Sequence, residues 1–500
     1  MRSIKRILIA NRGEIAVRII RTCKELDIKA IAVFSDPDRA ALHVQYADEA
    51  FRLPGARAGE TYLNRELILS IAKKANADAI HPGYGFLSEN PDFATLVAES
   101  GMAFIGPSAN AIRLLGDKTE ARAVARRLKI PTVMGSIDAL KTEEEAFKTA
   151  GEIGFPVLLK AAAGGGGKGM RIVRSESEFR QAYEMAKSEA KKAFADERIY
   201  IEKYVENPHH VEIQILADHH GNVVYLGERD CSIQRRHQKV IEESPSPIID
   251  DATRRAMGIA AVRLAKEAGY TNAGTVEFLV DEKKNFHFLE VNTRLQVEHP
   301  VTEVITGIDI VREQIHIAEG KALTMRQEAI HRHGHAIECR IYAEDPENDF
   351  LPSTGVLTHY AAPTGPRTRI DNGAQQGDEV QIYYDPMLSK VITWGENRLD
   401  AIKTMKRALS EFRIHGIQTT IPFCLFTLDH QVFAQGLHST SFVPQYFSQE
   451  LLRNKIRPVG RLIAAIAAAL FIRKMSDGPT VRNGRDGTAA WKAQRVDNHR

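Results

Sequence analysis

The sequence predicts a multidomain protein of mixed α/β class, and three observations lead to this expectation. The chain has 500 residues, more than one hydrophobic core usually serves, so about three domains are expected. Residues 6–34 follow the order strand, helix, strand that is typical of a βαβ unit. Residues 157–173 carry a run of glycines between two strand-like segments. The composition, 43% apolar and 26% charged, is that of an ordinary soluble globular protein.

The first domain is expected to be an α/β domain spanning residues 1–114. Its opening strand, RILIA, is followed by a helix with apolar residues at helical spacing and then by the strand KAIAVF. The turn between the first strand and the helix reads NRG, so the unit lacks the glycine fingerprint of dinucleotide-binding folds. Further strands are expected in DAIHPG and in MAFIGPS, where the domain closes.

Two further regions, 115–332 and 333–448, and a tail, 449–500, follow this domain. The second region begins with a helix rich in Ala and Arg, continues with a charged helix in KTEEEAFKTAGEIG, and then contains the glycine run. The third region contains another alternating strand and several short turns. Residues 455–500 hold ten basic and three acidic side chains, a net charge of +7 against +3 for the whole chain. The tail is therefore a basic appendage on a mildly acidic body.

The segment VLLKAAAGGGGKGMRIV at 157–173 predicts a flexible hairpin that folds over phosphates. Successive glycines let backbone N–H groups converge on an anion, and Lys160 and Lys168 flank them. The segment is not an ordinary P-loop, because Gly169 and Met170 follow Lys168 where a P-loop has Ser or Thr and then a helix. A disordered surface loop is the alternative, since glycine runs also mark linkers.

A second pattern, at residues 274–300, indicates a site for a divalent cation. Two strand-like segments joined by a charged turn predict a hairpin. Glu277 on the first strand can face Glu290 on the second, with Asn292 next along the same face. Hard oxygen ligands of this kind, which leave places for water and phosphate, suit Mg²⁺. The alternative is a solvated polar face, but it does not explain Glu277 among apolar neighbours.

The chain is expected to bend after Asn292. If it stayed extended, eight residues at roughly 3.3 Å each would place Glu298 about 26 Å from Glu290, too far for one small-molecule site. A loop would bring Arg294 and Glu298 back towards a metal-bound phosphate. A glutamate beside an arginine stays ionised near neutral pH and can act as a base.

A basic run within GERDCSIQRRHQKVIEESP is interpreted as a site for a small anion. Acidic residues on both sides cancel its local charge, so nucleic-acid binding is not expected. The polar and basic side chains of the run are Gln234, Arg235, Arg236, His237 and Lys239.

Several histidines are open to more than one interpretation. His331, His333 and His335 alternate along an expected strand and could chelate a transition metal. Because no carboxylate or cysteine lies beside them at ligand spacing, partly exposed strand histidines are the favoured interpretation. Either His209 or His210 could contact a nucleotide.

The four cysteines, Cys23, Cys231, Cys339 and Cys424, are far apart, with no pair at metal-ligand or redox spacing. This pattern favours a reducing compartment without structural zinc, and the cytoplasm is the expected location. The N-terminus, MRSIKRILIANRGE, leads directly into a strand-like segment, so no signal peptide is expected. The apolar run at 462–472 is shorter than the ~20 residues of a membrane span, so no span is expected.

A series of motifs follows in unbroken order: ANRGEIAVRIIR, HPGYGFLSEN, FIGPS, GDK, KAAAGGGGKGM, EKYVENPHHVEIQ, ERDCSIQRRHQK, EFLV and LEVNTRLQVEHPVTE. Together they resemble the biotin carboxylase subunits of biotin-dependent carboxylases, over residues 4–448. The resemblance implies an N-terminal α/β domain of the pre-ATP-grasp type and a central ATP-grasp domain whose glycine-rich lid, at about 134–205, closes on ATP. It also implies a C-terminal α+β domain that completes the active site.

The resemblance also implies roles for individual residues. Glu277, Glu290 and Asn292 would hold Mg²⁺ or Mn²⁺. Glu298 would be the base that deprotonates bicarbonate, and Arg340 would stabilise the enolate form of biotin. Bicarbonate would be held by Lys239, Arg294, Gln296 and Val297. ATP would be contacted by Lys118, Lys160, Gly166, Gly167, Glu202, Lys203, Val205, His210, Gln234 and His237.

The activity implied is ATP-dependent carboxylation of biotin by bicarbonate through carboxyphosphate, the first half-reaction of an acyl-CoA or pyruvate carboxylase, as in fatty acid biosynthesis. The chain has no Ala-Met-Lys-Met biotin-acceptor motif. Biotin is therefore expected to arrive on a biotin carboxyl carrier protein. A carboxyltransferase subunit is a further expected partner, and the chain itself is expected to form a homodimer. The tail, with a short apolar helix, is a possible docking element. The alternatives are another ATP-grasp ligase or an ATP-binding regulatory subunit without catalysis.

Overall fold

The computed structural model describes residues 3–136, 140, 142–161, 170–194 and 197–476. Two units separate along the chain: residues 1–448, called the body, and residues 449–500, the tail. The described strands of the body form sheets of eight, five and three strands and three two-stranded sheets, and the site described below lies on the eight-stranded sheet.

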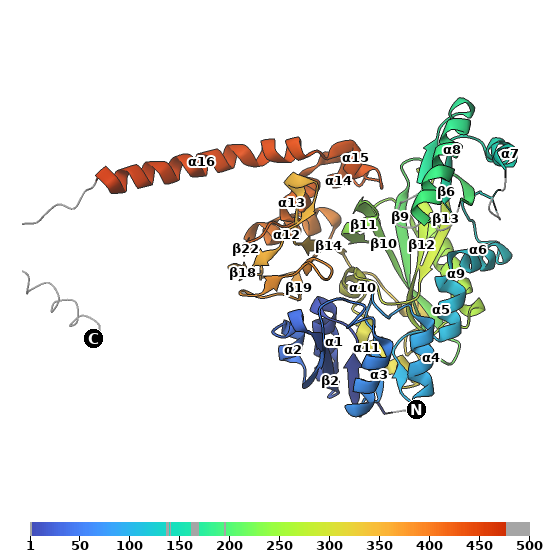
Figure 1. Ribbon diagram of the computed structural model, residues 1–500, viewed down its shortest axis with the longest axis horizontal. Coiled ribbons are helices and arrows are strands. Elements are labelled where there is room, and N and C mark those ends of the chain that lie inside the picture. Colours follow the sequence, from blue (N-terminus) through green and yellow to red (C-terminus); the bar gives the residue numbers. More distant parts are fainter. Residues whose placement is uncertain (1–2, 137–139, 141, 162–169, 195–196, 477–500) are drawn as a thin grey trace, which may run out of the picture. The chain divides into compact units, whose positions relative to one another are not determined.

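A five-stranded parallel sheet organises the first part of the body, in the order β3-β2-β1-β4-β5 (Figure 1, blue). Its central strand β1 (Arg6–Ile9) is buried because helices cover both faces. Ile7 and Ile9 pack with α1 (Gly13–Glu25), whereas Leu8 packs against the opposite helices. The βαβ unit is confirmed, and the other elements are β2 (Lys29–Ser35), η1 (Asp36–Asp38), α2 (Leu42–Tyr46), β3 (Glu49–Leu53), α3 (Arg65–Lys74), β4 (Ala79–His81), α4 (Pro91–Glu99) and β5 (Ala103–Phe104).

An eight-stranded antiparallel sheet runs through the second and third regions, in the order β13-β12-β9-β10-β11-β14-β21-β19 (Figure 1). Strand β11 (Gln238–Ser244) pairs with β14 (His335–Tyr342), so the sheet crosses the boundary expected at residue 332. The other strands are β9 (His209–Ala217), β10 (Val223–Arg235), β12 (Asn272–Val280), β13 (Phe286–Asn292), β19 (Thr368–Asn372) and β21 (Met387–Gly395).

Alternation along β9 and β12 separates an apolar face from a polar one. Val211, Ile213 and Val276 belong to a buried cluster on one face. Glu212 lies between Val211 and Ile213 in the sequence, and Glu277 directly follows Val276, so their side chains point to the opposite face. Helices α10 (His299–Thr306) and α11 (Ile310–Ala318) cover other parts of the sheet. The apolar cluster is completed by α5 (Ala109–Gly116), α6 (Lys118–Arg127) and α9 (Asp251–Glu267).

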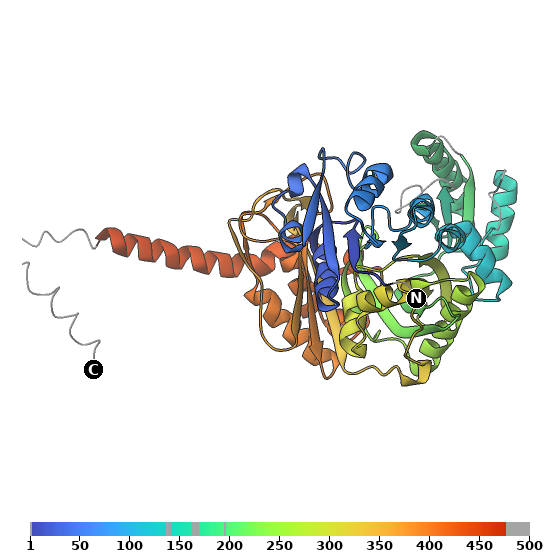
Figure 2. The same cartoon turned by 90° about the horizontal axis from the view of Figure 1, so that it is seen from below.

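A small antiparallel sheet, β7-β6-β8, contains the two strands that flank the glycine run in the sequence (Figure 2). Strand β6 (Val157–Ala161) pairs with β7 (Met170–Val173) and with β8 (Ile199–Lys203), so the hairpin strands are confirmed. The glycines between them, including Gly166 and Gly167, and Lys168 lie outside the described residues. Helices α7 (Glu143–Ile153) and α8 (Glu176–Phe194) share a buried cluster with the three strands.

The third region covers β14 and β21 with helices. Ile337, Cys339 and Val391 pack in one cluster with α12 (Arg398–Glu411) and α13 (Ile421–Asp429). The short helix η2 (Gln327–Ala329) precedes this region. Its shorter elements are β15 (Glu344–Asp345), η3 (Pro346–Asn348), β16 (Leu351–Pro352), β17 (Gly355–Val356), β18 (His359–Ala361), β20 (Glu379–Val380), β22 (Arg413–His415), α14 (Gln431–Ala434) and α15 (Phe442–Tyr446).

The alternating strand expected across His331, His333 and His335 is wrong in part. Strand β14 begins only at His335, and the two preceding histidines are exposed and irregular. Gly334 has φ +68°, in the left-handed region, so it interrupts the extended backbone between His333 and His335. His335 is buried, and its Nε2 lies 2.7 Å from a carboxylate oxygen of Glu243.

The described part of the tail forms one helix, α16 (Gln449–Ser476), whose 28 residues make it longer than the short apolar helix expected. Residues 465–473 are exposed within this helix. Residues 477–500, which the sequence predicts to be disordered, lie outside the described part of the chain. Across the part that the structure describes, no helix is both long and apolar enough to cross a membrane.

Candidate active site

The candidate site lies on the polar face of the eight-stranded sheet. Glu277 of β12 is in register with Glu212 of β9 on one side and with Glu290 of β13 on the other. The predicted opposition of Glu277 and Glu290 is therefore confirmed. Glu277 is 3% exposed, so the alternative of a solvated polar face does not hold for this residue.

Lys239 of β11 joins three carboxylates from separate segments. Its Nζ donates to Oε2 of Glu212 at 2.7 Å, to Oε1 of Glu277 at 2.8 Å and to Oε1 of Glu298 at 2.8 Å. Burial alone would lower the pKa of Lys239, but the acidic groups around it outweigh burial and raise it well above its ordinary value. The ammonium group is therefore charged and fixed among the three carboxylates.

Glu298 lies in the bend expected after Asn292. Strand β13 ends at Asn292, and α10 begins directly after Glu298. The Glu298 side chain is fully buried, and its second oxygen accepts from Nη2 of Arg340 at 3.0 Å. Burial alone would raise the pKa of Glu298, but Lys239 and Arg340 outweigh burial and hold it well below its usual range. Glu298 is therefore ionised at neutral pH and can accept a proton.

Arg294 is held by contacts that the sequence did not reveal. Its Nε donates to Oε2 of Glu89 at 2.9 Å, and Glu89 belongs to the N-terminal region. Its two Nη atoms donate to Oε1 of Gln296 at 2.8 Å and to Oδ1 of Asn292 at 3.1 Å. Asn292 and Gln296 in turn donate to Oε1 of Glu277, at 2.8 and 3.2 Å. The bend is thus cross-linked to β12 and to the first domain.

Arg340 of β14 lies between two carboxylates. Besides Glu298, its Nη2 lies 2.5 Å from Oε1 of Glu242 on β11. Burial raises the pKa of Glu242 to about 7, even though Arg340 opposes the shift. Sequence reasoning treated Glu242 only as a flanking acid that cancels local charge, because its pairing with Arg340 requires β11 and β14 to be neighbours.

A fully buried arginine, Arg229, supports the cluster from β10. Its Nε donates to Oε1 of Glu212 at 2.5 Å, and its other nitrogens donate to Gln214, Thr275 and Thr302. Sequence reasoning assigned no role to Glu212 or Arg229. The signal that could have found Glu212 is a charged residue between Val211 and Ile213, in a strand that is buried throughout.

Ion pairs hold several of the predicted nucleotide residues. Lys160 of β6 forms an ion pair with Glu202 of β8, and Nζ of Lys118 lies 2.6 Å from Oε2 of Glu290. His237 lies in the turn between β10 and β11, with φ +66°. Burial and then the charges of His210, Lys160 and Lys118 lower the pKa of His237.

Three other predicted nucleotide residues have different surroundings. Gln234 pairs in register with Lys239 across β10 and β11. The Nζ of Lys203 donates to the carbonyl oxygens of Gly154 and Phe155, both at 2.9 Å. Val205 follows β8 and is half-buried. Lys203 therefore binds the backbone directly after the C-terminal end of α7.

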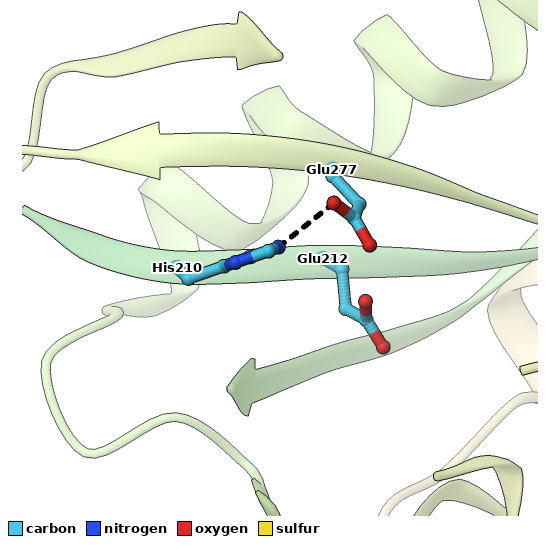
Figure 3. A group of neighbouring side chains, drawn as sticks. All are labelled: His210, Glu212 and Glu277. Carbon is cyan, nitrogen blue, oxygen red and sulfur yellow. Dashed lines mark ion pairs between the residues drawn. The ribbon is translucent and has the colours of Figure 1, made fainter. Parts of the chain in front are cut away.

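His210, Glu212 and Glu277 form the group shown in Figure 3, with His210 and Glu212 on β9 and Glu277 on the neighbouring strand. Nε2 of His210 lies 3.0 Å from Oε2 of Glu277. This group resembles a metal site, but the ammonium of Lys239 contacts both carboxylates. In this structure both carboxylates of the group are therefore paired with Lys239.

The predicted metal ligands fit a hard divalent cation. Glu277 and Glu290 oppose each other, and Asn292 lies beside Glu277, to which its Nδ2 donates, while its amide oxygen accepts from Arg294. Each carboxylate is already paired with an ammonium, Glu277 with Lys239 and Glu290 with Lys118. Two anionic groups that attract cations, with an oxygen donor next to them, are what Mg²⁺ or Mn²⁺ requires.

Comparisons with known proteins agree over most of the chain. Family models match at residues 3–112 (biotin carboxylase, N-terminal domain), 117–326 (carbamoyl-phosphate synthase L chain, ATP binding domain) and 338–445 (biotin carboxylase C-terminal domain). Biotin carboxylase 1 of Bacillus subtilis is 53% identical over 444 residues, which are 89% of this chain and 99% of that protein. The chain belongs to the biotin carboxylase family.

Two further matches are to a chain and to a domain of named carboxylases. The mitochondrial propionyl-CoA carboxylase alpha chain of Sus scrofa is 49% identical over 470 residues, 93% of this chain but 64% of that protein. The biotin carboxylase domain of the Hydrogenobacter thermophilus 2-oxoglutarate carboxylase matches with a TM-score of 0.84 and 48% identity, covering 89% of this chain and 98% of that one. That structure is a dimer with MgADP, ADP and bicarbonate.

The family membership confirms three predictions. The fold is the three-domain architecture of the biotin carboxylases, with an ATP-grasp domain at the centre. The activity is ATP-dependent carboxylation of biotin, so the chain is a ligase. The comparisons favour this activity over that of another ATP-grasp ligase or an inactive subunit.

Proposed function

We propose that the body carboxylates biotin with bicarbonate and MgATP, using Glu298 as the base and Lys239 as the group that joins the base to the phosphate-binding face. One observation carries this assignment: Nζ of Lys239 lies 2.8 Å from an oxygen of Glu298 and 2.8 Å from an oxygen of Glu277. The proton acceptor and a proposed metal ligand therefore share one cation.

Binding of ATP is assigned to the cationic side chains near the sheet and to the glycine hairpin. Lys118 forms an ion pair with the proposed metal ligand Glu290, and Lys160 forms one with Glu202 on β8. The charges of both lysines act on His237 and lower its pKa. These groups hold phosphates by charge and hydrogen bonding. The remaining contacts to ATP are assigned to Gly166, Gly167, Glu202, Lys203, Val205, His210 and Gln234.

Glu277, Glu290 and Asn292 are assigned to Mg²⁺ or Mn²⁺. When bound, the cation neutralises phosphate oxygens and so lowers the barrier to phosphoryl transfer. Lys239 and Lys118 supply positive charge to the same carboxylates in its absence.

Bicarbonate is assigned to the bend after β13. Arg294, Gln296 and the backbone at Val297 are its assigned contacts together with Lys239, and the hydrogen bonds to Glu89 and Asn292 fix the Arg294 guanidinium. Glu298 takes the bicarbonate proton as a bicarbonate oxygen attacks the γ-phosphorus of ATP and ADP leaves. The product is carboxyphosphate. Precise positioning supplies most of the acceleration in such transfers.

The second step is assigned to biotin and Arg340. Carboxyphosphate breaks down to CO₂ and phosphate, the phosphate takes the ureido N–H proton, and the ureido nitrogen attacks CO₂. A guanidinium near the ureido oxygen stabilises the negative charge that develops there. Arg340 is buried and lies 3.0 Å from Glu298, so the enolate stabiliser and the base adjoin. The glycine hairpin is assigned the exclusion of water from carboxyphosphate.

Biotin is proposed to arrive on a biotin carboxyl carrier protein, and the carboxyl group to leave on a carboxyltransferase subunit. The relatives bear names for different acyl acceptors, including propionyl-CoA, methylcrotonoyl-CoA and 2-oxoglutarate. A homodimer is proposed because the Hydrogenobacter domain is a dimer. Fatty acid biosynthesis and a cytoplasmic location stay predictions. The four cysteines are free and buried, in keeping with a reducing compartment.

The proposal is tested by ATP hydrolysis and by ¹⁴C transfer from bicarbonate to free biotin. The purified chain is expected to form acid-labile N-carboxybiotin and to hydrolyse ATP faster when biotin and bicarbonate are both present. A folded chain that binds ATP but transfers no label would contradict the activity, whereas label transfer that Glu298→Gln leaves unchanged would contradict the assignment of the base.

A further inference from the structure

Two cross-strand partners hold two consecutive residues of the bicarbonate bend. Arg340 of β14 is in register with Lys390 of β21. Arg340 donates to the carboxylate of Glu298 at 3.0 Å, and Nζ of Lys390 donates to the carbonyl oxygen of Val297 at 2.8 Å. Two neighbouring strands thus bind two neighbouring residues of the bend: β14 binds the side chain of Glu298, and β21 binds the backbone of Val297.

Lys390 is fully buried and collects partners from three segments. Its Nζ lies 3.2 Å from Oε2 of Glu14 on α1 and 3.8 Å from Oδ2 of Asp371 on β19. Asp371 is also the register partner of Lys390 across β19 and β21. The carbonyl of Val297 is the remaining partner, so the first domain, the third region and the bend meet at one ammonium group.

The packing around this ammonium leaves little room for adjustment. A side chain at Gly373, which follows β19, would approach the backbone nitrogen of Glu14 to 2.5 Å. Glu14 also accepts a hydrogen bond from the hydroxyl of Tyr84 in the first domain. Helix α1 is therefore pressed directly onto β19, and Lys390 is confined between them.

Lys390 is charged in this position. Burial alone would lower its pKa, but Glu14, Glu338 and Asp371 outweigh burial and raise it above the ordinary value. A buried charge of this kind is retained at a cost unless its partners are fixed. The only backbone group among these contacts is the carbonyl at Val297, directly before the proposed base.

We propose that Lys390 is a positioning residue for the carboxylation reaction: it fixes the Val297 carbonyl and thereby sets the direction of the Gln296–Glu298 backbone towards bicarbonate. This inference rests on the proposed function of Glu298 and Val297. Lys390 itself does not reach the reactants, because it lies behind the bend among Glu14 and Asp371. Its effect is to orient groups that do.

The inference predicts a change in bicarbonate binding rather than in ATP binding. A displacement of about 1 Å at reacting groups lowers rates by on the order of 100-fold. Lys390→Met should therefore raise the KM for bicarbonate about tenfold and lower kcat, while the Kd for ATP stays within about twofold. A merely structural role would reduce the folded fraction, which lowers kcat and leaves KM unchanged.

The experiment compares Lys390→Met with a matched control, Lys406→Met, in the full chain. Lys406 lies on α12 and forms an ion pair with Asp429, so the control removes an ammonium from the same region without touching the bend. The double variant Glu14→Gln/Lys390→Met removes the paired carboxylate as well, and it provides folded enzyme if the single variant unfolds. Steady-state kinetics give KM and kcat, and thermal unfolding gives the folded fraction.

A raised bicarbonate KM in the Lys390 variants, with normal ATP binding and a normal control, supports the inference. An unchanged bicarbonate KM in the folded single or double variant overturns it. Glu298→Gln, measured in parallel, separates this outcome from failure of the proposed function. If the wild-type chain is active, Glu298→Gln is inactive and Lys390→Met has normal kinetics, the positioning role of Lys390 is rejected while the proposed function stands.

Discussion

The ammonium group of Lys239 lies 2.8 Å from Oε1 of Glu298, and both side chains are buried. The same ammonium also contacts Glu212 and Glu277. The proposed base, a proposed metal ligand and a third carboxylate thus share one ammonium group. Arg340 also pairs with Glu298, and Arg229 also pairs with Glu212, so several buried cations balance these carboxylates.

Replacing Glu298 by Gln should separate ATP binding from turnover. The proposed nucleotide residues lie elsewhere, so the Kd for ATP should change by less than about twofold, whereas loss of a general base lowers bicarbonate-dependent turnover by at least about 100-fold. Calorimetry and ATPase assays measure the two quantities. Glu328→Gln, at an exposed position, is the control. Parallel losses of ATP affinity and rate would show that the assignment is wrong.

Lys239→Gln should also lower bicarbonate-dependent turnover while the Kd for ATP stays nearly unchanged, and it should lower the free energy of unfolding more than Glu298→Gln does. It leaves three buried carboxylates without their shared cation, and breaking a buried ion pair costs about 3–5 kcal/mol. Urea unfolding at pH 7 measures this cost, and bicarbonate-dependent ATP hydrolysis measures turnover. If the folded variant retained wild-type turnover, Lys239 would have no part in the reaction.

The hairpin at the site could be predicted because its signals are local. Two alternating segments joined by a charged turn determine both strands and the opposition of Glu277 and Glu290. The bend after Asn292 followed from the length of an extended chain together with the premise that Glu290 and Glu298 serve one small-molecule site. In contrast, alternation failed at His333, because Gly334 takes a left-handed conformation that breaks the strand.

The contacts that order the site could not be predicted, because they join segments far apart in the sequence. Glu89 meets Arg294 across 205 positions, and Lys390 meets Val297 across 93. These contacts depend on how the first domain packs on the large sheet, which no local pattern encodes. Family resemblance supplied the role of Arg340 but gave no indication of Glu242, its partner on β11.

Replacing Glu290 by Gln should weaken the metal site without abolishing it. One anionic ligand is lost while Glu277 and Asn292 remain, so extra Mg²⁺ should restore activity only in part. Activity measured against Mg²⁺ concentration at fixed ATP tests this expectation. Glu282→Gln, at an exposed position in the turn of the same hairpin, is the matched control. A Mg²⁺ dependence identical to that of the wild type would exclude a metal role for Glu290.

Acid should destabilise the body partly through Glu243. Burial would raise its pKa, but Arg398 and His335 outweigh burial and hold it at about 2. Because the folded pKa is below the unfolded value, this contribution is present above about pH 4.5 and is lost as the pH falls towards 2. It amounts to roughly 3 kcal/mol.

Glu243→Gln should therefore lower the free energy of unfolding most at pH 6–7, and the difference from the wild type should shrink below about pH 4. Urea unfolding across this range measures the difference, with Glu328→Gln as the exposed control. A difference that stays constant with pH would mean that ionisation of Glu243 does not stabilise the fold.

Removing the tail should spare carboxylation of free biotin but weaken assembly with a carrier or carboxyltransferase subunit. Ile466, Leu470, Phe471 and Ile472 are each more than half exposed in α16, and exposed apolar side chains of this kind mark protein interfaces. The charge of +7 over residues 455–500 suits an acidic partner. Truncation at Leu452 is compared with the full chain in one preparation, by label transfer to free biotin and by co-purification with the partner subunits. If the truncated chain remains folded but cannot carboxylate free biotin, the tail belongs to the catalytic unit and the docking hypothesis fails.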